Sequence, residues 1–505
     1  MSELISSAPE WRALADHHQR LSATTIAELL ATDPGRASRM TLATGGVVLD
    51  YSRNLVDGAA LSALHALAQR AQLSDRVKDY FAGAGVNTSE DRPALHWLYR
   101  DPKNEFSLDG TDPMPEVRGT LKRMGAFCSA VRAGTYRGAS GERIADVVNV
   151  GMGGSDAGPR LATGALSHLA SDVPRVHFLS NVDGHGLDAL LGQLHPAHTL
   201  CIITSKSFTT PETLRNAETL KEWLGAESIA RQMVAITADK DAARAMGIAD
   251  ANIFPIPPWV GGRYSLWSAV GIAVGTALGM EVFHELLEGG KLMDDHFRSA
   301  PAGENLPVTL ALLDIWHRNI CAYPTRATVV YDDRLRDLVP WLQQLVMESL
   351  GKSVTTDGTA VEYQTGPVVW GGTGTSAEHS FFQSLHQGTD TVPLDLIGVI
   401  AADHDHAEHH RMLLAHLLGQ AAALTHGDQS EDPHRRVPGN RPCNVFLLDR
   451  LTPRCLGALL ALQEHRVFVQ AAILDLNPFD QFGVELGKRL AADIETGSLA
   501  GLDSS

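Results

Sequence analysis

The amino-acid sequence predicts an α/β protein built from two doubly wound units, each a parallel sheet covered by helices. From about residue 106 onward, short apolar runs alternate with helical segments, which is the pattern of a parallel sheet. The pattern occurs twice, and each half has a strand that opens into a glycine-rich loop. A chain of 505 residues is also too long for one ordinary core. We therefore expect a ligand site in the crevice at the carboxyl ends of the strands.

The elements follow in order along the chain. Residues up to about 105 are predicted to be helical, with helices over 13–30 and 59–71 and a turn at 33–35. Strands are predicted at 146–150, 200–204 and 233–237 in the first half, and at 367–370, 394–400 and 444–448 in the second. These predictions divide the chain into an N-terminal helical arm (1–105) that packs on the second unit, a first α/β unit (106–280), and a second α/β unit with a C-terminal helix (281–505).

Composition excludes several classes of function. A net charge of −17 argues against non-specific nucleic-acid binding, which needs cations to neutralise phosphates. The five cysteines form no CxxC pair, which favours reduced, buried thiols. The N-terminus has no basic region followed by an apolar core, and the longest uncharged stretch, 264–280, is short for a membrane span and favours a buried helix. We expect a soluble, cytoplasmic protein without nucleic-acid or membrane partners.

A cluster of hydroxyls and one lysine lies where a helix is predicted to start. Thr210 fits the N-cap of that helix, and Pro211 fits its first position. Capping explains Thr210, but it leaves Ser205, Lys206 and Ser207 unexplained. A helix start beside hydroxyls and a cation favours phosphate binding, with an ordinary helix cap as the alternative.

A carboxylate and an arginine are candidates for proton transfer. Residues 341–350 are predicted to form a helix with Gln344 and Glu348 on the face opposite its apolar residues. Glu348 falls in the last turn, where the helix dipole disfavours a negative charge, and this suits a general base; a solvated surface glutamate is the alternative. Arg263 follows two glycines. It is either a member of a structural ion pair or a group that binds an oxyanion.

Four further motifs allow both a functional and a structural interpretation. Ser155 lies in a glycine turn that lacks the third glycine of a dinucleotide fingerprint, so the turn either caps a helix or meets a ligand. His379 follows a glycine-rich loop and is expected to project into the crevice, unless its role is structural. Gln481 and Lys488 lie seven residues apart, so a helix would point them the same way. The histidine-rich run 403–410 is too irregular for a metal site and favours a solvated loop that enters a helix.

Taken together, these segments resemble the glucose-6-phosphate isomerase (phosphoglucose isomerase) family nearly end to end. The most specific are Gly-Gly-Arg-Tyr-Ser at 261–265 and Gln-x-Gly-Val-Glu-x-x-Lys at 481–488. Further matching segments are 49–54, 87–92, 151–159, 205–217, 347–352 and 380–389. The resemblance implies two sugar-isomerase (SIS-type) subdomains. It also implies an aldose–ketose isomerase that interconverts glucose 6-phosphate and fructose 6-phosphate through a cis-enediol, in glycolysis and gluconeogenesis.

The resemblance also implies a role for each candidate residue. Glu348 matches the base, and Arg263 matches the group that stabilises the enediolate. His379 and Lys488 match groups that assist ring opening, with the histidine supplied by the partner subunit of a homodimer that shares its active sites. The remaining matches are substrate contacts: Ser205, Lys206, Ser207 and Thr210 around the phosphate, and Ser155, Gln344 and Gln481 elsewhere. The resemblance implies no metal, and it implies no nicotinamide because no hydride leaves the substrate.

The chain departs from the family pattern in one loop and at two single positions, where Ser207 replaces the usual threonine and Phe482 replaces a usual tryptophan. Residues 371–379 read Gly-Gly-Thr-Gly-Thr-Ser-Ala-Glu-His, where the family usually has Gly-Glu-Pro-Gly-Thr-Asn-Gly-Gln-His. The early glutamate is lost and Glu378 is gained beside His379, which can change the charge or the subunit contact there. Two other functions stay open: an isomerase of an amino sugar or of mannose 6-phosphate, and a non-catalytic sugar-phosphate sensor, although no basic helix-turn-helix is visible.

Overall fold

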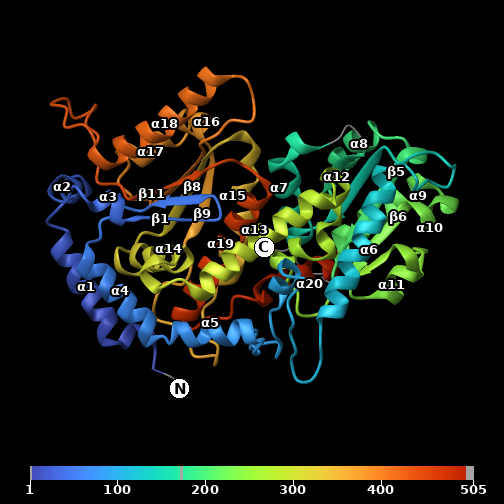
Figure 1. The fold of residues 1–505 in the computed structure, drawn as a ribbon, viewed down its shortest axis with the longest axis horizontal. Coiled ribbons are helices and arrows are strands. Elements are labelled where there is room, and N and C mark those ends of the chain that lie inside the picture. Colours follow the sequence, from blue (N-terminus) through green and yellow to red (C-terminus); the bar gives the residue numbers. More distant parts are fainter. Residues whose placement is uncertain (1–2, 171–173, 496–505) are drawn as a thin grey trace, which may run out of the picture.

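The computed structural model describes residues 3–170 and 174–495, and it contains two α/β units that lie side by side (Figure 1). The predicted segments 1–105, 106–280 and 281–505 each include a few positions outside the described residues, namely 1–2, 171–173 and 496–505. Within the described ranges, no helix has the length and apolar character that a membrane crossing needs.

The first unit is built on a parallel sheet of five strands. In spatial order the strands are β4 (Arg175–Leu179), β3 (Asp146–Gly151), β5 (Thr199–Thr204), β6 (Met233–Thr237) and β7 (Ile253–Pro255). The central strands β3, β5 and β6 are buried along their whole length, as expected for a sheet covered on both faces. These three are the strands that the sequence predicts, and the less buried or shorter edge strands β4 and β7 gave no clear signal.

The second unit is built on a sheet of six strands. Their spatial order is β1 (Thr41–Thr44), β2 (Val47–Asp50), β11 (Cys443–Leu448), β10 (Leu394–Val399), β8 (Thr325–Tyr331) and β9 (Val368–Thr373). The last four are parallel to one another, whereas β2 pairs antiparallel with both β1 and β11. The prediction of an entirely helical N-terminal segment is therefore wrong for residues 41–50. Gly45 and Gly46 both have positive φ, which closes β1 and β2 into a hairpin.

Helices cover both sheets and fill the space between them. The N-terminal helices are α1 (Pro9–Leu21), α2 (Ile26–Thr32), α3 (Arg36–Arg39), α4 (Gly58–Arg70) and α5 (Leu73–Ala82). Those of the first unit are α6 (Met114–Arg132), α7 (Ala157–Ala165), α8 (Gly184–Leu191), α9 (Pro211–Leu224), α10 (Ile229–Gln232), α11 (Lys240–Ala245) and α12 (Ile272–Leu278). The remaining ones are α13 (Met280–Ser299), α14 (Leu306–Ile315), α15 (Leu338–Leu342), α16 (Gly374–Glu378), α17 (Phe382–Gln387), α18 (Ala407–His426), α19 (Pro453–Ile473) and α20 (Glu485–Glu495).

Two predicted helices are interrupted in the structure. The predicted helix 13–30 is two helices, because Thr25 and Glu28 form a reciprocal capping box that starts α2 anew. The stretch 264–280 is buried as predicted, but it consists of 3-10 turns followed by α12. Gly279, with φ +96, ends α12 before α13 begins.

Helix α19 is almost entirely buried and lies near the middle of the molecule (Figure 1). Every residue of α19 except Arg454 is buried, and the helix packs along α13 and α14. Its charged residues are therefore away from water and need partners in the protein. Arg466 donates to Asp314 of α14 at 2.6 and 2.7 Å and to Asp395 of β10 at 2.7 Å. One side chain of α19 thus joins a core helix to the second sheet.

The same aspartates bind further groups. Arg326 of β8 donates to Asp314 at 2.8 Å, and Asn444 of β11 donates to Asp395 at 2.8 Å. Burial alone would raise the pKa of Asp314, but the charges of Arg326 and Arg466 outweigh it and lower that pKa. The network therefore holds an ionised carboxylate in the core.

We predict that Arg466→Met destabilises the protein strongly. The substitution leaves two buried carboxylates with too few donors, a change that typically costs about 3–5 kcal/mol. The midpoint of urea unfolding should fall accordingly. Arg215→Met is the matched control, because Arg215 and its partner Glu218 are mostly exposed and such surface pairs contribute little. Equal midpoints for the two variants would contradict this account of the core.

Candidate active site

The site is assembled from segments that are far apart in the sequence. The turn after β3, a 3-10 turn at Gly262–Trp267 and the helical segment that carries Glu348 come together beside residues 477–481. The first two segments belong to the first unit, and the other two belong to the second. The site therefore lies where the two α/β units meet.

Two glycines allow the segments of the two units to approach each other closely. A Cβ added at Gly154 would lie 1.9 Å from the carbonyl oxygen of Gly262 and 2.6 Å from the amide nitrogen of Arg263, so only glycine fits there. Gly153 has φ +56, and its Cβ position would lie 2.8 Å from Nε2 of Gln344. The glycine turn thus contacts both the arginine segment and the glutamate segment, with the half-buried Ser155 next to it.

Glu348 ends a wide π-helical turn, Gln343–Glu348, that continues α15. The sequence predicts an ordinary α-helix here, and single π turns inside helices are frequent at functional sites. Oε2 of Glu348 accepts a hydrogen bond of 3.0 Å from Nε2 of Gln344 and lies 3.4 Å from Nη1 of Arg263. Its side chain is 22% exposed. The carboxylate is therefore oriented by two neighbours and still open to a ligand.

Arg263 is almost completely buried, and its guanidinium joins four groups. Nε donates to Oγ of Ser349 at 2.7 Å, and Nη1 donates to Oε1 of Gln481 at 3.0 Å. Nη2 donates to the carbonyls of Pro478 and Asp480. A charge fixed in this way has little freedom to move and can stabilise negative charge that develops beside it.

Lys352 is a site residue that sequence reasoning missed. Its ammonium donates to the carbonyl of Glu348 at 3.1 Å and to Oδ1 of Asp480 at 2.7 Å. Asp480 also accepts from Ser89 and Asn477. Burial lowers the pKa of Lys352, against the opposing effect of Asp480. The Lys352–Asp480 pair thus fixes the 477–481 turn against the Glu348 segment. The only sequence signal for Lys352 was its place in the family-matching segment 347–352.

A cavity of about 960 Å³ opens in front of these groups. Among its lining residues are Gln344, Glu348 and Gln481, together with Ser89 and Lys352. Such a volume suits a small metabolite bound by a few polar groups.

The Ser/Thr segment lies at the carboxyl end of β5. Thr210 is the N-cap of α9, but its hydroxyl makes no capping bond and lies 3.0 Å from Oγ of Ser205. Ser207 and Thr209 form a similar hydroxyl pair at 2.6 Å. Between them Phe208 is buried with φ +51, an unusual backbone conformation that packs its ring into the core under the loop. The loop is thus held in shape without using the hydroxyls as caps.

Lys206 turns toward the protein rather than away from it. Its ammonium donates to the carbonyls of Pro258 and Val260 at 2.8 and 2.9 Å, directly before the Gly261–Gly262 pair. Burial, with the nearby charge of Arg92 as a second cause, lowers the pKa of Lys206 to about 8. Lys206 therefore connects the Ser/Thr loop to the segment that carries Arg263.

His379 and Lys488 lie apart from this cavity. Both side chains are exposed, and neither belongs to the described residues that line it. The prediction that Gln481 and Lys488 share one helical face is wrong, because Gln481 precedes a 3-10 turn at Phe482–Val484 and α20 begins only at Glu485.

In the histidine-rich run, Asp403 binds Arg334 and Arg450. Across residues 3–170 and 174–495, no cluster of three potential metal ligands of the His, Cys, Asp or Glu type is formed.

The carboxylate lies beside the buried arginine where two sheet-based units meet, and Lys206 connects the hydroxyl-rich loop to the arginine segment. This arrangement is the one expected of a sugar-phosphate isomerase. The model of the family described as phosphoglucose isomerase matches residues 50–503. The chain belongs to this family.

Relatives and solved structures agree with this assignment. The chain is 44% identical to glucose-6-phosphate isomerase of Cupriavidus metallidurans, over 96% of this chain and 93% of that protein. It is also 44% identical to the enzyme of that name from Roseiflexus sp., over 97% and 94%. A crystal structure of a glucose-6-phosphate isomerase from Chlamydia trachomatis superimposes with a TM-score of 0.90 at 30% identity, covering 98% of this chain and 96% of that one.

We predict that ligand binding depends on the charge of Lys206. Lys206→Ala should raise KM for sugar phosphates more than it lowers kcat, because the binding loop is disturbed rather than the base. In the unaltered protein, affinity should fall as the pH rises through about 8, since Lys206 loses its proton there. Lys206→Arg should remove this step, because a guanidinium stays charged. Inhibition by inorganic phosphate across the pH range measures both effects.

The matched control is Lys221→Arg, on the last turn of α9 away from the loop. It should keep the pH dependence of the unaltered protein. A step at the same pH in Lys206→Arg would show that another group titrates.

Proposed function

We propose that Glu348 is the base with which this member of the phosphoglucose isomerase family interconverts glucose 6-phosphate and fructose 6-phosphate. The observation that carries the proposal is the pairing of a cavity-facing carboxylate with the buried Arg263, 3.4 Å away. Moving a carbonyl between neighbouring carbons requires a proton to leave C2 and return at C1, and one carboxylate within reach of both atoms can do this.

Each neighbour then has a defined task. Glu348 takes the proton from C2, and the electrons form the cis-enediolate. Arg263 stabilises the oxygen that becomes negative, because its charge is already fixed beside the carboxylate before the reaction starts. Gln344 donates to Glu348 and keeps the reacting oxygen turned toward the cavity. Glu348 finally returns the proton to C1. The step transfers no hydride to a cofactor.

The far end of the substrate provides binding energy for positioning. Ser205, Lys206, Ser207 and Thr210 are the proposed phosphate contacts, and Ser155 and Gln481 contact the rest of the sugar. Binding at the phosphate holds C1 and C2 against Glu348, so the interaction lowers the barrier at a distance. The support for this assignment is the loop geometry, in which the hydroxyls of Ser205 and Thr210 are not used for capping.

Ring opening is assigned to two groups outside the cavity, His379 and Lys488. Their exposure fits a homodimer in which His379 of each subunit enters the active site of the partner subunit. Lys488, on α20, would then lie over the active site of its own subunit. We further propose that the protein works in the cytoplasm, and that residues 1–105, 106–280 and 281–505 are its arm and its two sugar-isomerase subdomains.

We predict that Glu348→Gln abolishes isomerisation and leaves binding of fructose 6-phosphate largely intact. The amide keeps the size and the hydrogen bonds of the side chain, but it cannot carry the proton. Coupled conversion of fructose 6-phosphate and calorimetric binding measure the two properties. Glu218→Gln, an exposed substitution on α9, is the control and should behave as the unaltered protein. Near-normal turnover in Glu348→Gln would refute the assignment of the base.

A mixing experiment tests the shared site. Glu348→Gln and His379→Ala are each expected to be nearly inactive, but a mixed dimer contains one site with an intact Glu348 from one subunit and an intact His379 from the other. Unfolding and refolding an equal mixture should restore activity in about a quarter of all sites. If His379 served its own subunit, no mixed dimer would have a complete site and activity would not return.

A further inference from the structure

The glutamate that departs from the family pattern is buried and bound on both oxygens. Glu378 is the last residue of α16, directly before His379. Its Oε1 accepts a hydrogen bond of 2.9 Å from the hydroxyl of Tyr331, and its Oε2 lies 2.8 Å from Nδ1 of His416. The Glu378 side chain is only 10% exposed. A carboxylate held in this way fixes the end of α16.

Tyr331, the last residue of β8, supports α16 at both ends. A Cβ at Gly374, the first residue of α16, would lie 2.3 Å from the tyrosine ring, so the helix starts in direct contact with it. The hydroxyl of the same ring reaches Glu378 at the other end. Burial, and then the charge of Glu378, raises the pKa of Tyr331, so the hydroxyl stays protonated and donates. One side chain of the sheet therefore sets the direction of α16.

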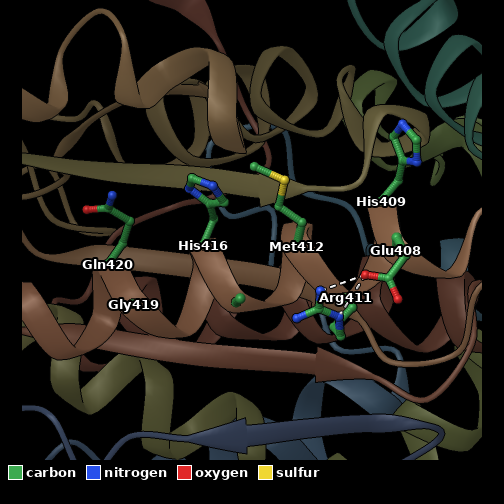
Figure 2. Close-up of a pocket in the computed structure, with 8 residues that line it drawn as sticks. Glu408, His409, Arg411, Met412, His416, Gly419 and Gln420 are labelled. Atoms are coloured by element: carbon green, nitrogen blue, oxygen red, sulfur yellow. Dashed lines mark hydrogen bonds and ion pairs between the residues drawn. The ribbon is translucent and has the colours of Figure 1, made fainter.

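Helix α18 gives the second support. Figure 2 shows His416 and Gln420 projecting from the same face of α18, one turn apart. His416 binds Glu378, and Gln420 lies 2.7 Å from Nε2 of His386 on α17. The segment that contains His379 is thus fastened to α18 on both sides, at 378 and at 386. Between these points, the amide of His379 donates to the carbonyl of Ser376 at 3.1 Å, while its side chain is exposed.

We infer that Glu378, Tyr331 and His416 are positioning residues for the imidazole of His379. The inference rests on the proposed role of His379 in ring opening. An exposed side chain gains little direction from its own packing, so its orientation follows from the backbone on which it stands. That backbone is fixed one residue earlier by the Glu378 contacts, which link β8, α16 and α18. The three side chains act through His379 and do not touch the substrate.

The test compares a cyclic substrate with an open-chain ligand. Glu378→Ala and His416→Ala should each lower kcat for glucose 6-phosphate about 10- to 100-fold, since a small misplacement of a reacting group has this effect. Affinity for a linear aldonic acid phosphate, which needs no ring opening, should stay unchanged. The double variant should lose no more than Glu378→Ala alone, because that substitution already removes the contact with His416.

Further variants separate positioning from folding. Tyr331→Phe removes only a hydroxyl and should also lower kcat while the protein stays folded and keeps its subunit stoichiometry. Glu378→Gln restores the family's usual residue, can still accept from Tyr331, and should recover most of the activity. His409→Ala is the matched control, because His409 is exposed on the same helix (Figure 2) and is not a partner of Glu378.

The inference is overturned if both alanine variants turn over glucose 6-phosphate at the unaltered rate. It is also overturned if their loss of kcat is matched by an equal loss of affinity for the linear ligand, because the contacts would then maintain the whole site. A failure of the proposed function looks different: the unaltered protein itself would not convert glucose 6-phosphate.

Discussion

The guanidinium of Arg263 is the contact on which the geometry of the site depends. It is nearly excluded from water, so its charge must be satisfied by groups held at fixed positions. Those groups come from the Glu348 segment, through Ser349, and from the turn that ends at Gln481. Because the arginine itself belongs to the other unit, the same hydrogen bonds that satisfy it also hold the two units together. The contacts that satisfy the buried charge of Arg263 therefore also position the proposed base, Glu348.

A second set of buried charges, on helix α19, stabilises the position of the arginine segment. Helix α19 carries Glu464, which accepts from Trp267 at 2.9 Å and also binds Arg100. Trp267 lies at the end of the 3-10 turn that begins beside Arg263. The central helix thus contacts both the second sheet, through Arg466, and the arginine turn, through Glu464. Such ionic contacts have strict geometric demands, which favours one arrangement of the two units over others.

The sequence was most informative where a residue's chemistry depends on its neighbours in the chain. Buried parallel strands such as β5 and β6 are continuous apolar runs, and the structure confirms them. The sequence also singled out Glu348, Gln344, Arg263 and Gln481, which the structure brings together. Their catalytic and binding roles remain predictions that the experiments above test.

The missed features depend on contacts across the fold. Lys352 becomes a site residue only because the 477–481 turn lies next to it, about 130 residues later in the chain. Lys206 looks like a free cation in the sequence, but the nearby carbonyls of Pro258 and Val260 take its hydrogen bonds. The heptad spacing of Gln481 and Lys488 failed because a 3-10 turn lies between them, which changes the rotation per residue. Sequence spacing predicts a shared face only within one regular helix.

The antiparallel pairing of β2 with β11 also means that the second sheet can be completed only late in synthesis. The two strands lie about 400 residues apart, and ribosomes add about 5–20 residues per second, so β2 waits roughly 20–80 s for its neighbour. All five strands of the first sheet are synthesised in that interval, whereas β2 still lacks its neighbour β11. The hairpin of β1 and β2 therefore gains its permanent neighbour only near the end of synthesis, after the strands of the first sheet.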